Sequence, residues 1–188
     1  MQTLEFTKEA LARSTKAVTL RPQVGQYTHK NSAVIENGTR CRVHEKHLDM
    51  IVDVPPSIGG GGEGPSPGTL VRSALTSCIA IGVKLWAARA DIQIDYIDVQ
   101  LEADADARGE MGVDDDIAPG FLVTRLIIAV RSNAPKKDVE AVIARSLKYS
   151  PLYDIYTNEQ NIAMTYDIAN GDYPDLGGSY SDGELRYA

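Results

Sequence analysis

Two thiols are the side chains of this sequence with the most distinctive chemistry. Cys41 and Cys78 are the two cysteines among 188 residues, which is too few for a disulfide scaffold and is typical of a reducing compartment. Cys78 lies in an apolar segment, where a cysteine is ordinarily an inert packing residue. Cys41 lies between Arg40 and Arg42, whose charges would favour a thiolate, but in a strand its side chain points away from the face that both arginines share. We therefore interpret Cys41 as a half-buried strand residue.

The histidines offer no clear metal chemistry. His44 and His47 are close in sequence, but together with His29 and the two isolated cysteines they show no paired-ligand spacing. Structural zinc sites depend on such spacing. We expect neither a metal nor another cofactor, and we assign no role to these histidines.

The charge of the chain excludes several classes of partner. The formal net charge is −7, and no basic cluster offsets the repulsion of nucleic acid or an anionic membrane surface. The N-terminal residues lack the basic stretch and apolar core of a secretory signal. The apolar run after Ser77 is interrupted by Lys84, Arg89 and Asp91, which predicts that it does not span a bilayer. We expect a cytoplasmic, soluble protein.

The N-terminal part of the sequence predicts a helix followed by an antiparallel sheet. Residues 3–14 have an amphipathic helical pattern. Asn37-Gly38 is the strongest hairpin signal in the chain and lies between two strand-like segments. The strands are expected at 15–20, 32–36 and 41–54.

The longest apolar segment is predicted to be a buried central helix. It follows a loop over 55–67 that contains four consecutive glycines, so this loop cannot be a helix or a central strand. Ser66 is a natural N-cap and Pro67 fits the first helical position. The helix, near residues 67–90, is apolar almost all round, which predicts burial by the sheet and by a second subunit. We therefore expect a homodimer.

The C-terminal part completes an α+β fold. Strands are predicted at 92–103 and 121–130, joined by an acidic loop over 104–120 that contains Asp114. A second helix begins after Pro135 and ends before Pro151, and a last strand is expected at 161–168. The chain is interpreted as one domain, residues 1–188, with an N-terminal arm over about 1–30 and an irregular tail over about 169–188.

The segment around Cys78 resembles the core signature of the OsmC/Ohr family. Its parts are Asp53-Val54-Pro55, the glycine loop, Gly64-Pro65-Ser66-Pro67, and the helix with a small residue before Cys78. The resemblance covers about residues 32–168. It implies an α+β fold in which two subunits interlock, with antiparallel sheets, a long central buried helix, and active sites at the dimer interface.

The resemblance also implies thiol-dependent reduction of organic hydroperoxides, an oxidoreductase function in oxidative stress. A thiolate on the central helix attacks the peroxide to give a sulfenic acid, and a second cysteine just before a proline resolves it as a disulfide. Cys78 occupies the first of these positions.

Two departures from the family pattern bear on this chemistry. Ser150 occupies the position of the second cysteine, before Pro151, and its hydroxyl cannot form a disulfide. Gly68 occupies the position where related peroxidases have a glutamate that pairs with a thiol-activating arginine. Glu63 with Arg40 or Arg42 is a conceivable replacement pair.

Three functional hypotheses follow. The leading one is a peroxidase that uses Cys78 and is reduced by an external thiol. The second is a non-catalytic family member that binds a small hydrophobic ligand in the dimer-interface pocket, which Gly68 and Ser150 favour. The third, a partner-binding module, rests on the acidic loop and the tail alone.

Overall fold

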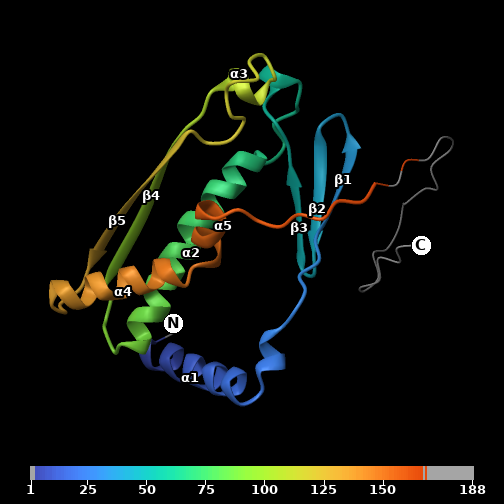
Figure 1. Ribbon diagram of the computed structural model, residues 1–188. Coiled ribbons are helices and arrows are strands. Elements are labelled where there is room, and N and C mark those ends of the chain that lie inside the picture. Colours follow the sequence, from blue (N-terminus) through green and yellow to red (C-terminus); the bar gives the residue numbers. More distant parts are fainter. Residues whose placement is uncertain (1–2, 167, 169–188) are drawn as a thin grey trace. The chain divides into compact units, whose positions relative to one another are not determined.

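The computed structural model describes residues 3–166 and residue 168. The chain divides into two units, residues 1–158 and 159–188, and the elements below all belong to the first unit (Figure 1). The expected irregular tail over 169–188 lies outside the described residues.

The N-terminal helix is longer than expected. Helix α1 spans Leu4–Leu20, and the Thr3 side chain accepts a hydrogen bond from the backbone N–H of Phe6. The predicted strand at 15–20 is therefore wrong. Its threonines and valine have high β-propensity, but they continue an N-capped helix, and adding a residue to an existing helix costs far less than starting a new element. A short 3₁₀ turn, Pro22–Gly25, follows.

An antiparallel three-stranded sheet follows, with the order β1-β2-β3. Strand β1 spans Ser32–Asn37 and turns at Gly38, whose positive φ of 55° suits glycine. The expected single strand at 41–54 is in fact two strands, β2 (Arg40–Glu45) and β3 (Leu48–Val52). The turn between them places Lys46 at a positive φ of 51°. Glycine or asparagine usually occupies such a position, and neither is present here to indicate the turn in the sequence.

The central helix is confirmed. Helix α2 spans Pro67–Arg89, Ser66 is its N-cap, and the Ser66 hydroxyl accepts a hydrogen bond from the N–H of Thr69 at 3.3 Å. The preceding loop is also confirmed, and it contains one 3₁₀ turn at Pro56–Ile58.

The second half of the unit adds a two-stranded antiparallel sheet and the remaining helices. Strands β4 (Tyr96–Asp104) and β5 (Val123–Arg131) pair in register along their whole length. The connection carries a short helix α3, Ala107–Glu110, where a loop was expected. Helix α4 spans Lys136–Lys148, as Pro135 predicted.

Two further elements differ from the predictions. Helix α5, Pro151–Thr157, begins immediately after α4, with Ser150 as its N-cap. It was missed because Pro151 was interpreted as the end of a helix, although proline is equally suited to begin one. The strand expected at 161–168 is wrong for the described residues of that range, which form neither helix nor strand. A strand needs a hydrogen-bonding partner, which an alternating sequence alone does not supply.

The core is built around one face of α2. Leu75, Ile79 and Val83 are almost completely buried and pack with Ile94 and Val142. Helix α2 contacts α1, α4, α5 and strand β4 (Figure 1). By length and composition α2 is also apolar enough to cross a membrane, contrary to the expectation from its interrupting charges. In this fold, however, its buried face forms the core.

Helices α2 and α4 are in close contact at Gly82. A Cβ atom placed on Gly82 would lie 2.5 Å from Ser146 Oγ. Ser146 is almost fully buried, and its hydroxyl donates to the carbonyl oxygen of Ile79 at 3.4 Å. The absence of a side chain at Gly82 therefore allows this contact between the helices.

We predict that Gly82→Ala lowers the free energy of unfolding by about 1–3 kcal/mol, because the added methyl group overpacks a filled interface. In a Ser146→Ala background the clash is removed. The same substitution should then be neutral, or should stabilise by up to about 1 kcal/mol through helix propensity. Urea denaturation of the four proteins measures both effects. Equal effects of Gly82→Ala in the two backgrounds would contradict the contact.

Candidate functional site

The thiol of Cys78 lies next to the hydroxyl of Ser150. The two atoms, Sγ and Oγ, are 3.3 Å apart and either can be the donor. Cys78 is half-buried on α2, and Ser150 is buried between α4 and α5. The structure thus brings together the two positions that the sequence analysis selected from the family pattern, although they are 72 residues apart.

Helix packing sets this distance. Gly82 on α2 faces Ser146 on α4. Cys78, four residues before Gly82, faces Ser150, four residues after Ser146. Residues four apart lie on the same face of a helix. The two segments run in opposite directions where they touch. The contact between Gly82 and Ser146 therefore positions the contact between Cys78 and Ser150, one helical turn away.

The Ser150 hydroxyl is held in a defined orientation. Its oxygen accepts a hydrogen bond from the N–H of Tyr153 at 3.1 Å, which caps the first turn of α5. A hydroxyl has one proton to donate and two lone pairs to accept with. With one lone pair occupied by Tyr153, its proton can be directed to the sulfur.

Cys78 also borders an apolar stripe of α2. Val71, Ala74, Cys78 and Ile81 follow helical spacing along one side of the helix. Val71 and Ile81 are 48% and 59% exposed, in contrast with the buried Leu75 and Ile79. Substrate or a second protein chain can therefore reach the thiol from this stripe.

The glycine loop before α2 is organised by Asp53. This carboxylate is 3% exposed and accepts hydrogen bonds from the Thr39 hydroxyl and from the N–H groups of Val54, Gly61 and Glu63. Hydrogen bonds from Thr39 and from the Glu63 backbone lower the pKa of Asp53 from 3.8 to about 2, against the opposing effect of burial. Asp53 thereby holds the loop against the sheet.

Glu63, the acid considered for a replacement pair, binds Arg40. Arg40 Nε donates to Glu63 Oε2 at 2.7 Å, and Arg40 also pairs with Glu36. Arg42 instead binds Glu36 and Asp49. Both arginines bind Glu36, in agreement with their predicted shared face. Among the described residues, no contact links the Arg40–Glu63 pair to Cys78 within this chain.

A second cation near the site was missed by the sequence analysis. Arg72 donates to the Thr69 hydroxyl, and its guanidinium lies 5.7 Å from the ring centroid of Phe121. A Cβ atom on Gly68 would be 3.2 Å from the Arg72 guanidinium. The relevant signal was the spacing of four residues between positions 68 and 72, which places them one helical turn apart.

Tyr156, on α5, lies near Arg72. Its hydroxyl is buried and, within the part of the chain that the structure describes, has no hydrogen-bond partner. Burial raises the pKa of Tyr156, and the nearby charge of Arg72 opposes this shift. Cys41 lies elsewhere, paired with Val52 in the three-stranded sheet. No metal-binding group of three histidine, cysteine or acidic side chains occurs in the described ranges.

Fold and site together define a class: an α+β protein with a half-buried thiol on its core helix, opposite the N-cap of a following helix. The sequence profile of the OsmC-like protein family matches residues 60–165. The chain belongs to this family.

Solved structures share the fold. The OsmC-like protein of Mycoplasma pneumoniae is 15% identical, with a TM-score of 0.59 over 70% of this chain and 88% of that one. The organic hydroperoxide resistance protein OsmC of Legionella pneumophila is 17% identical, with a TM-score of 0.52 over 70% of this chain and 90% of that one. A search of curated protein sequences found no match.

We predict a pH-dependent contribution of Asp53 to stability. Because its pKa is about 2 in the folded protein and ordinarily 3.8, its stabilising effect is present above pH 3.8 and is lost as the pH falls toward 2. The melting temperature of the native protein should fall more steeply over this interval than that of Asp53→Asn, which should be less stable at neutral pH.

Thermal melts at several pH values measure this difference. Asp104 and Asp106 also have lowered pKa values, because Arg125 and Arg108 respectively bind them. Both variants retain these groups, so only the difference between the two curves reports on Asp53. Parallel curves would contradict the assignment.

Proposed function

We propose that this protein reduces organic hydroperoxides in the cytoplasm as part of an oxidative stress response. Cys78 is the reacting thiol and an external small-molecule or protein thiol is the reductant. The observation that carries the proposal is the half-buried Cys78, 3.3 Å from the Ser150 hydroxyl and open along an apolar stripe. The family and the organic hydroperoxide resistance protein of the same fold support this chemistry.

The first step is a displacement at oxygen. The Cys78 thiolate attacks the peroxide oxygen that carries the hydrogen, a sulfur–oxygen bond forms, and the oxygen–oxygen bond breaks. The products are a sulfenic acid on Cys78 and an alkoxide, which takes a proton and leaves as the alcohol. Ser150 donates its hydrogen bond to the thiolate before attack and remains an alcohol throughout.

An external thiol completes the cycle, because Ser150 supplies no sulfur. One thiol condenses with the sulfenic acid to give a mixed disulfide and water. A second thiol attacks that disulfide, releasing the oxidised reductant and restoring the Cys78 thiol. Two external thiols are therefore oxidised for each hydroperoxide reduced.

A homodimer would complete the site. The Val71, Ala74 and Ile81 stripe is uncovered in one chain, and apolar residues of the three-stranded sheet are exposed as well, including Ile35 and Leu48. Pairing of two copies would bury these surfaces around Cys78. In such an arrangement the second copy would bring its Arg40–Glu63 pair to the thiol and so supply the activating cation.

We predict that an organic hydroperoxide oxidises Cys78 and that dithiothreitol supports turnover. Cys78→Ser should abolish peroxide consumption, whereas Cys41→Ser is the matched control and should retain it. Consumption of cumene hydroperoxide, with mass mapping of both cysteines, measures this. Oxidation of Cys41 with Cys78 unchanged in a folded protein would instead favour the hydrophobic-ligand alternative.

Ser150→Cys separates the geometry of the site from its activity. The new thiol would lie within disulfide reach of Cys78, and one equivalent of hydroperoxide should produce an internal bridge that is absent from the native protein. A bridge without dithiol-supported turnover would show that the geometry is right but that the thiol is not activated.

We also predict a dimer in solution. Light scattering after size-exclusion chromatography should give twice the chain mass at micromolar concentration. Ile81→Glu should shift the protein toward monomer, because it places a charge within the apolar stripe. Val113→Glu is the matched control, since Val113 is 72% exposed in the connection between β4 and β5. A monomeric native protein would contradict the proposed site at the dimer interface.

A further inference from the structure

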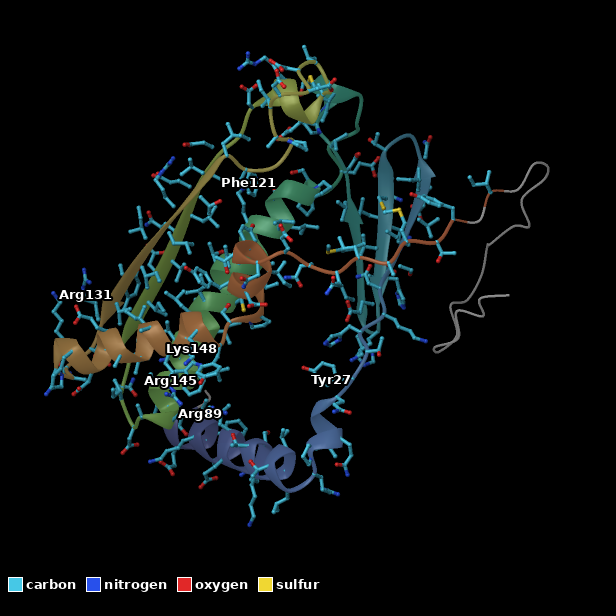
Figure 2. All side chains as sticks on the ribbon, viewed as in Figure 1. Tyr27, Arg89, Phe121, Arg131, Arg145 and Lys148 are labelled. Atoms are coloured by element: carbon cyan, nitrogen blue, oxygen red, sulfur yellow. The ribbon has the colours of Figure 1, made fainter. Side chains whose placement is uncertain are left out.

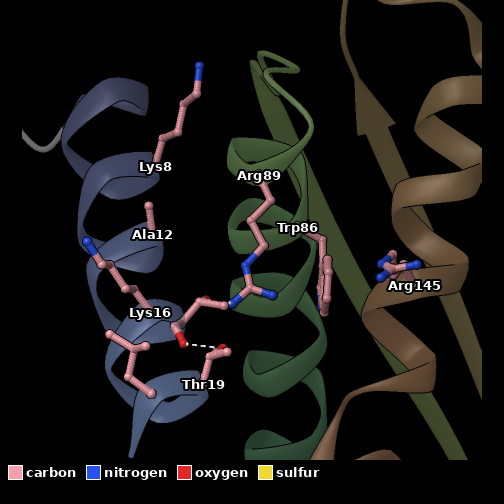
Figure 3. A pocket seen from close by; sticks show the side chains of 9 residues that line it. Lys8, Ala12, Lys16, Thr19, Trp86, Arg89 and Arg145 are labelled. Atoms are coloured by element: carbon pink, nitrogen blue, oxygen red, sulfur yellow. Dashed lines mark hydrogen bonds between the residues drawn. The ribbon is translucent and has the colours of Figure 1, made fainter.

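A groove unrelated to Cys78 lies along helices α1 and α2. Its volume is about 660 Å³, which is within the range of small-molecule sites. The lining side chains include Lys8, Lys16, Arg89, Arg145 and Trp86, and no acidic residue is among them (Figure 3). Such a cluster is unusual in a chain with 26 acidic and 19 basic residues.

Two arginines of this groove are held by one tryptophan ring. The guanidinium of Arg89 lies 4.5 Å from the ring centroid of Trp86, and that of Arg145 lies 4.8 Å from it. Figure 3 shows Trp86 between Arg89, on the side of α1, and Arg145 on α4. Tyr149 stacks on Trp86 at 5.1 Å and also lies 5.4 Å from Arg145. The aromatic rings therefore hold both guanidinium groups by cation–π contacts.

The hydrogen-bonding edges of these arginines remain available. Arg89 donates one hydrogen bond, to the Thr15 hydroxyl. Within the described ranges, neither Arg89, Arg145 nor Lys16 forms an ion pair, whereas Lys8 binds Asp91 at 2.8 Å. Asp138 is the acidic residue of an adjoining groove that shares Trp86 and both arginines. A stacked guanidinium keeps its in-plane N–H groups free, in the fork geometry that matches a carboxylate or phosphate.

Electrostatic repulsion between the two arginines favours binding of an anion in this groove. Two guanidinium groups against one ring repel each other, and no carboxylate of the groove offsets their charge. A bound anion would offset the positive charge that the two groups place beside the groove. The groove wall beside them is apolar, with Ala12, Leu20 and the indole of Trp86, and Leu20 is 69% exposed.

We propose that this groove binds an organic anion with a carboxylate or phosphate head and an apolar body. Arg89 holds the head on the α1 side of Trp86, Arg145 and Lys16 contribute charge, and the body lies against Leu20 and Ala12. The site is separate from Cys78 and does not depend on the proposed peroxidase activity. The ligand is a free small molecule, because the net charge of −7 opposes approach to an anionic membrane.

Trp86 is the single tryptophan of the chain and provides a direct probe. Octyl phosphate and octanoate, at concentrations below micelle formation, should change its fluorescence saturably, with one ligand per chain, and calorimetry should give the same affinity. Octanol, which lacks the charge, and inorganic phosphate, which lacks the apolar body, should each bind at least about tenfold more weakly.

Substitutions locate the site. Arg89→Gln and Arg145→Gln should each weaken octyl phosphate binding about tenfold or more. Arg131→Gln, at an exposed arginine at the end of β5, apart from the groove (Figure 2), should leave it unchanged. Arg89→Lys and Arg145→Lys retain the charge and serve where a glutamine variant does not fold, as circular dichroism shows. Arg89→Lys should still weaken binding, because lysine lacks the bidentate fork, whereas Arg145→Lys keeps the charge and should bind as the native protein does.

Several results would overturn the proposal. They are no saturable binding at millimolar octyl phosphate, equal binding of octanol, equal binding of inorganic phosphate, or equal weakening by Arg131→Gln. Cys78→Ser should bind octyl phosphate as the native protein does. Loss of peroxidase activity in that variant with binding retained distinguishes this site from the proposed active site.

Discussion

The close approach of α2 and α4 at Gly82 is the constraint on which the site depends. Without a side chain at Gly82, the Ser146 hydroxyl reaches the backbone of α2, and the chain that continues from α4 places Ser150 against Cys78. The same crossing brings Arg145 and Tyr149 to the ring of Trp86. This one helix contact thus positions Cys78 and Ser150 on one side and the cationic groove on another.

The two sides of α2 are buried to different extents. Leu75, Ile79 and Val83 form the core, whereas Val71 and Ile81 remain exposed. A helix that is apolar all round is unfavourable in water unless each side is covered. Within the chain, β4, α4 and α5 cover one side. The uncovered side borders Cys78, so the thiol lies next to exposed apolar surface.

The sequence predicted the features that depend on local signals. The Ser66 cap, the α2 boundaries and the hairpin at Gly38 are local properties of backbone and side chain. The sequence left open whether Arg40 or Arg42 would pair with Glu63, and in the structure Arg40 does. The missed features depend on tertiary context: the turn at Lys46, the helix that begins at Pro151, and the contact of Arg72 with Phe121. None of them has a marker that is specific in sequence alone.

Ser150 has consequences for how this sequence can change during evolution. Its oxygen caps α5 and contacts Cys78 at the same time, within a buried position. Alanine would leave the Tyr153 N–H without its capping partner, aspartate would bury a negative charge against the Cys78 sulfur, and threonine would add a methyl group at a buried position. Few substitutions of Ser150 would therefore be tolerated. The residue that contacts Cys78 is constrained first by the geometry of a helix start.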